Sequence, residues 1–176
     1  MLRIVMLCLA SMLALASTPV LARDKPAQLA KQAGPANHSM GDTVVKMSLA
    51  KGVSLDDAAE SMKLRANRLN MQLVAELPLS KQVEAITGKP TPRVTIYQFC
   101  DAMTAHHMLN YNLDFAAYLP CRIALVEDAK GQGWLVMMDL NPLINAANLQ
   151  PKLKAMAIEV RNSLESIMKA GASGDL

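Results

Sequence analysis

The 176-residue sequence has few aromatic residues, little excess charge and no long apolar run after its first residues. Aromatic residues make up 3% of the chain, the formal net charge is +3, and the basic residues are dispersed. Proteins that bind nucleic acid usually have a clustered basic face or an aromatic stacking platform, so we expect no nucleic-acid partner. No later apolar run approaches the roughly 18 residues of a membrane-spanning helix, so we expect no membrane insertion of the mature chain.

The first 22 residues have the pattern of a secretory signal peptide. Arg3 precedes an apolar stretch, and Val20 and Ala22 put small residues at the two positions that signal peptidase reads. We therefore expect cleavage after Ala22 and a periplasmic location. Cys8 lies inside the signal and should be lost with it.

The remaining chain divides into three parts. Residues 23–40 are rich in Ala, Lys, Gln, Pro and Gly without a sustained period, which predicts a flexible linker. Residues 41–172 are long enough for a single α/β domain with a real core, and residues 173–176 form a short tail.

Cysteine is scarce in the mature chain, which keeps only Cys100 and Cys121. In an oxidising export compartment, an even pair of thiols favours one disulfide. The sequence also lacks a glycine-rich phosphate-binding loop and a C-x-x-C pair. We also expect no conventional hydrolase, because Ser54 is better explained as a helix cap than as a nucleophile. Whether the protein is an enzyme at all stays open.

Apolar periodicity predicts strands that alternate with helices, followed by a hairpin and a last helix. Ser54 and Asp57 form an expected capping box before a helix, and Gly171 is expected just beyond the last helix. The expected strands cover 43–49, 71–77, 93–100, 121–127 and 134–140, and the expected helices 55–69, 81–87, 102–110 and 151–170. This order predicts a two-layer α/β sandwich, with one mixed sheet of about five strands and the helices on one face.

The stretch QFCDAMTAHHML, residues 98–109, gathers sulfur and imidazole groups at the start of an expected helix. At 100° per residue, Ala102, Ala105 and Leu109 share an arc that should face the sheet. His107 then falls on the far side, nearly in line with Cys100 and close to Met103, whereas His106 flanks the apolar arc. Asp101 is a candidate helix cap beside the first thiol.

Three interpretations of this stretch remain open. If the strands ending at Cys100 and starting at Cys121 are antiparallel neighbours, the two thiols meet, and they form a structural disulfide or a thiol site for redox, sulfur transfer or ligand capture. The third interpretation is a soft-metal site, most naturally copper, with Cys100, Met103, His107 and Cys121 as ligands. Asp101 and His106 are further ligand-binding candidates.

The blocks FCDAMTAHHML, AAYLPCRIALVED and WLVMMDLNPLI resemble the family known as domain of unknown function 302, in its exported bacterial form. The most specific pieces are the cysteine that ends one strand, Cys100, and the Leu-Pro-Cys that opens the next, ending at Cys121. The resemblance implies a two-layer α/β sandwich and is compatible with a homodimer. It supplies no reaction. An interaction module without chemistry, which dimerises through its sheet or its Met-rich last strand, therefore stays an alternative to a small-molecule, sulfur or metal site.

Overall fold

The protein is described from a computed structural model in which residues 43–175 are placed. The expected signal peptide and the whole of the expected linker lie outside the described residues. The elements follow the order β1 (Val44–Ser48), α1 (Leu55–Arg68), β2 (Gln72–Leu77), α2 (Leu79–Thr87), β3 (Val94–Cys100), α3 (Ala102–Tyr111), η3 (Leu113–Tyr118), β4 (Cys121–Glu127), β5 (Gly133–Met138), α4 (Asn141–Ala146) and α5 (Pro151–Ser173).

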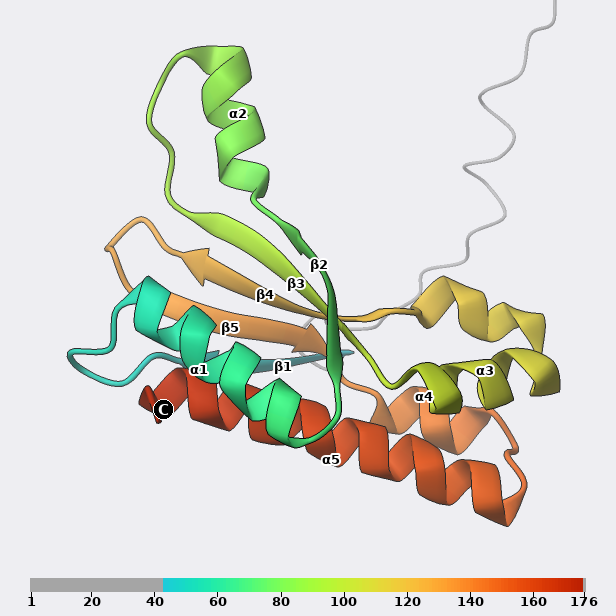
Figure 1. The fold of residues 1–176 in the computed structure, drawn as a ribbon. Coiled ribbons are helices and arrows are strands. Elements are labelled where there is room, and N and C mark those ends of the chain that lie inside the picture. Colours follow the sequence, from blue (N-terminus) through green and yellow to red (C-terminus); the bar gives the residue numbers. More distant parts are fainter. Residues whose placement is uncertain (1–42, 176) are drawn as a thin grey trace, which may run out of the picture. The chain divides into compact units, whose positions relative to one another are not determined.

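The five strands form one sheet in the order β1-β5-β4-β3-β2, with helices packed on it, which confirms the expected α/β sandwich. Every neighbouring pair is antiparallel, so the sheet is not mixed as expected. The reason is visible in Figure 1: α2 and α3 lie at opposite ends of the sheet and do not cross its face. Each strand that follows such a helix therefore runs back beside the previous strand, instead of forming a parallel β-α-β crossover.

Helices α1 and α5 pack side by side on one face of the sheet (Figure 1). Between them and the sheet lies a core in which Tyr97, Phe99, Ile123, Leu125 and Leu135 are fully buried. These side chains alternate along their strands with residues of the opposite face, as the pleat requires. The expected capping box starts α1, because the Ser54 hydroxyl accepts from the Asp57 N–H at 3.0 Å.

Gly171 lies inside α5, so the prediction that it follows the helix end is wrong. The helix continues to Ser173, and Gly174, at φ 74°, is the residue that ends it. A Cβ on Gly171 would lie 2.6 Å from Cγ of Met62 and 3.1 Å from the carbonyl oxygen of Ala58. The missing side chain thus allows α5 to approach α1 closely. The sequence pattern of glycines at helix ends does not reveal this contact.

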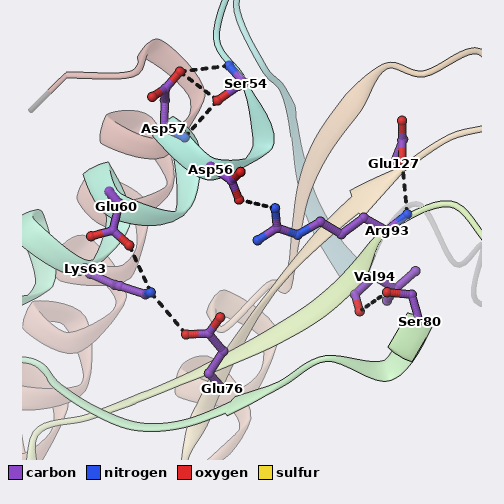
Figure 2. A network of polar contacts seen from close by, with 10 residues as sticks. All are labelled: Ser54, Asp56, Asp57, Glu60, Lys63, Glu76, Ser80, Arg93, Val94 and Glu127. Atoms are coloured by element: carbon purple, nitrogen blue, oxygen red, sulfur yellow. Dashed lines mark hydrogen bonds and ion pairs between the residues drawn. The ribbon is translucent and has the colours of Figure 1, made fainter. Parts of the chain in front are cut away.

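A network of ion pairs joins α1 to the strands β2 and β3 (Figure 2). The Lys63 ammonium lies 3.1 Å from carboxylate oxygens of both Glu60 and Glu76, and Arg93 pairs with Asp56. Burial lowers the pKa of Lys63, but hydrogen bonds to Glu60 and Glu76 outweigh it and leave the pKa raised. Because the positive groups are already paired with carboxylates, this network serves to attach α1 rather than to bind an anion.

Candidate functional site

The sheet brings Cys100 and Cys121 together at one end. Cys100 is the last residue of β3 and Cys121 the first of β4, and the antiparallel register sets Phe99 opposite Cys121. Both are free thiols in the structure. The disulfide that the sequence allowed is therefore not formed, although the antiparallel geometry on which it depended is present.

Cys100 and Cys121 both line one cavity of about 70 Å³. Its wall is almost entirely apolar and is formed by residues from the ends of the strands and from the helices around them. The lining residues are Met71, Cys100, Asp101, Thr104, Ala105, Met108, Phe115, Tyr118, Leu119, Cys121, Leu140, Leu143, Ile144, Leu149, Ala157 and Val160.

The cavity lies where the sheet ends and α3, η3, α4 and the first half of α5 gather; α3 and α4 mark this end of the sheet in Figure 1. Neither α4 nor η3 was expected from the sequence. Each is only six residues long, too short to show an apolar period, yet they supply Phe115, Tyr118, Leu143 and Ile144 to the wall. Pro142, at the start of α4, was the one available signal, because proline is favoured in the first turn of a helix.

Burial keeps both thiols protonated near neutral pH. It raises the pKa of Cys121 from 9.0 to about 11, with a further contribution from the neighbouring Cys100. Burial, and then the negative charge of Asp101, also raises the pKa of Cys100. A position at a helix N-terminus usually lowers a thiol pKa, but here the apolar surroundings and the carboxylate prevail.

Asp101 lies at the cavity, but its carboxylate caps α3. It accepts from the N–H groups of Met103 and Thr104 at 3.0 and 3.2 Å, and from the Thr104 hydroxyl at 2.8 Å. With these donors bound, its effect on the site is through its charge beside Cys100.

Helix α3 is rotated about its axis relative to the orientation expected from its apolar arc. The buried positions are Thr104 and Met108, not Ala102 and Leu109. Thr104 can be buried because Asp101 satisfies its hydroxyl. Ala105, from the expected apolar arc, also lines the cavity, so the buried side of α3 is rotated from the expected arc toward Thr104 and Met108.

His107, Met103 and His106 do not line the cavity. Met103 is 63% exposed, and both histidines are exposed on the outer side of α3. The His106 ring pairs with the Asn110 amide at 3.0 Å, and the two imidazole rings lie 6.0 Å apart. The structure thus brings together Cys100, Cys121 and Asp101 among the candidate residues, and leaves the other three outside.

Two buried methionines take the place that sequence analysis gave to Met103. Met71 is 2% exposed and Met108 is 5% exposed, and both line the cavity with the two thiols. Met71 precedes β2, far from the cysteines in the chain, so no local spacing connects it with them. The cavity therefore has four sulfur-containing side chains in its wall.

Among residues 43–175, no group of three or more His, Cys, Asp and Glu side chains is arranged to hold a metal ion. Nor does that segment contain a helix with the length and apolar character needed to cross a bilayer.

Together these features define a two-layer α/β sandwich with a thiol-lined apolar cavity at one end of an antiparallel sheet. The model of the family described as domain of unknown function DUF302 matches residues 45–171, and the chain belongs to this family. Its fold is similar to the crystal structure of an uncharacterized conserved DUF302 protein from Bacillus stearothermophilus, with a TM-score of 0.61 and 16% identity over 73% of this chain and 97% of that chain. No curated protein matches the sequence.

Proposed function

We propose that the cavity is a binding site for a ligand of only a few atoms, and that the Cys100 and Cys121 thiols contact this ligand. The observation that carries the proposal is the presence of both cysteines, unbridged, in the lining of one apolar cavity.

The size of the cavity limits the ligand. A cavity of about 150 Å³ is known to accommodate benzene, whereas this one has about 70 Å³. An organic molecule of drug size would have to displace α4 or η3. A monatomic, diatomic or similarly small soft ligand fits without such a movement.

The raised thiol pKa values favour binding over catalysis. Thiol exchange and nucleophilic attack use the thiolate, and the pKa of Cys121 is about 11. At neutral pH the site therefore holds protonated, polarisable sulfur atoms, which suit a soft ligand better than they suit redox turnover.

Xenon tests the proposal, because it is a small, apolar and polarisable probe that enters such cavities. Methyl NMR spectra of the labelled protein under xenon pressure should shift most at Ala105, Ile144 and Ala157. Ala157→Leu fills the cavity and should abolish these shifts. Ala85→Leu, on the exposed surface of α2, is the matched control and should leave them unchanged.

Absent shifts, or shifts that survive Ala157→Leu, would show that the cavity does not accept a ligand. The same preparation should titrate as two free thiols after unfolding. A protein isolated with the bridge closed would contradict the thiol form of the site.

We infer export from residues 1–22 alone. Sequencing the N-terminus of the protein from a bacterial periplasmic extract should give Arg23 as the first residue. An intact Met1 in the cytoplasmic fraction would contradict export.

A homodimer is a second candidate function, with the second copy on the sheet face that α1 and α5 leave open. Ile96, Ala124 and Val136 are half-buried on that face, and Met138 and Val44 are exposed. The Met-rich strand β5 lies between β1 and β4, so it cannot pair its backbone with a second copy. Sedimentation equilibrium should show a dimer that Val136→Lys dissociates; a monomer at all concentrations would refute it.

A further inference from the structure

We propose that the ligand of this cavity is a monovalent soft metal ion, Cu(I), bound by the sulfur atoms of Cys100, Cys121, Met71 and Met108. This inference rests on the proposed function, because it names the ligand of the same cavity. It uses Met71, which no local motif in the sequence connects with the cysteines, and Met108, which lies in the stretch 98–109 but was not among the expected ligands.

The chemistry of the wall selects the ion. Thiolate and thioether sulfur are soft ligands that favour Cu(I), whereas divalent ions of harder character prefer imidazole and carboxylate oxygen. The four sulfur side chains line the cavity, and the histidines of α3 do not. The single carboxylate at the wall, Asp101, is bound to its helix N-terminus.

Charge is compatible with this ion when one of the two cysteines coordinates as a thiolate and the other as a thiol. The single negative charge then neutralises Cu(I), so the complex carries no net charge into the apolar wall. The binding step leaves the metal at the same oxidation state: each sulfur that coordinates as a thiolate gives one proton to water, and the thioethers give none.

The four proposed ligands are held in place by the fold. Met71 and Met108 are nearly inaccessible to solvent, and the two cysteines are fixed at the ends of paired strands. The four side chains come from the residue before β2, the end of β3, α3 and the start of β4, so the ion would join α3 to the hydrogen-bonded strands of the sheet.

The test is an anaerobic titration of the reduced protein with Cu(I), supplied as its acetonitrile complex, in competition with bicinchoninate. We expect one Cu(I) for each chain. Cys100→Ser and Cys121→Ser should each weaken binding by at least about 100-fold, the upper end of what the loss of an outer-shell partner costs.

Paired methionine variants on α3 separate this ligand set from one on the outer side of the helix. Met108→Leu conserves volume and should weaken Cu(I) binding by about 10-fold or more. Met103→Leu is the same change at an exposed position of the same helix and should have no effect. His107→Ala should also have no effect. Circular dichroism melting of each variant checks that it is folded.

X-ray absorption of the copper-loaded protein should show sulfur neighbours only. A spectrum with an imidazole contribution, or weaker binding in Met103→Leu and His107→Ala but not in Met108→Leu, would overturn the assignment. Failure to bind Cu(I) would overturn it too. If xenon still enters the cavity in that case, the small-ligand site stands and only its metal is wrong; if neither binds, both proposals fall.

Discussion

Alkylation of Cys121 across a range of pH tests whether its thiol is as strongly protonated as its burial implies. The pKa rises from 9.0 to about 11 in the folded chain. Each pH unit changes the thiolate fraction about tenfold below the pKa, so at pH 8 the folded protein should hold about 100-fold less Cys121 thiolate than the unfolded chain. Iodoacetamide labelling, resolved by peptide mass spectrometry, measures the rate at this residue alone.

The midpoint of the pH profile is the decisive quantity, because limited access to the cavity lowers the rate at every pH without moving the midpoint. We expect a midpoint near 11 in the native protein and near 9 in denaturant. A native midpoint at or below 9 would refute the claim that burial raises the pKa of Cys121, and would favour a redox-active or nucleophilic thiol instead.

The same pKa shift predicts how stability depends on pH. The folded chain holds the Cys121 proton more tightly than the unfolded chain, so the contribution is fully present below pH 9 and is lost as the pH rises through 11. A shift of this size corresponds to about 2–3 kcal/mol. In Cys121→Ala, the free energy of unfolding should lose this part of its dependence between those two pH values.

Three further predictions concern the scaffold. Gly171→Ala should destabilise the protein by about 1–3 kcal/mol in urea unfolding, because the new Cβ meets Met62 at 2.6 Å; a gain from helix propensity would contradict the close helix contact. Ser54→Ala should cost about 1 kcal/mol through the loss of the cap on α1, and a neutral result would show that the cap is dispensable. Lys63→Met should cost less than about 1 kcal/mol, and the loss should be larger at low salt than at high salt. A loss of stability that does not depend on salt would mean that the pairs of Lys63 with Glu60 and Glu76 do not stabilise the fold electrostatically.

The strands could be predicted because their signals are local. Residues 45–49, most of them in β1, alternate between apolar and polar, and the β4–β5 hairpin is marked by Gly131 in its turn and Gly133 at the start of β5. The direction of β3 relative to β4 could not be settled in this way. It depends on α3 and η3 acting as a corner at the end of the sheet, and η3 has no apolar period of its own.

The candidate site could be predicted only in part. The two cysteines were found because the residues flanking them mark strand ends. The orientation of α3 was missed, because an apolar arc does not show that Thr104 can be buried once its hydroxyl is bonded. Met71 was missed for a different reason: it reaches the cavity from another strand end, and only tertiary packing brings it there.

A crystal structure of the reduced protein would test the convergence of the two thiols most directly. Successive residues of a regular strand point to opposite faces, and Phe99 shares its face with Cys121, so the direction of the Cys100 side chain at the end of β3 is the feature to measure. The account predicts both Sγ atoms in the wall of the same cavity, with Met71 and Met108 beside them. A Cys100 side chain that points to the open face of the sheet, away from Cys121, would contradict it.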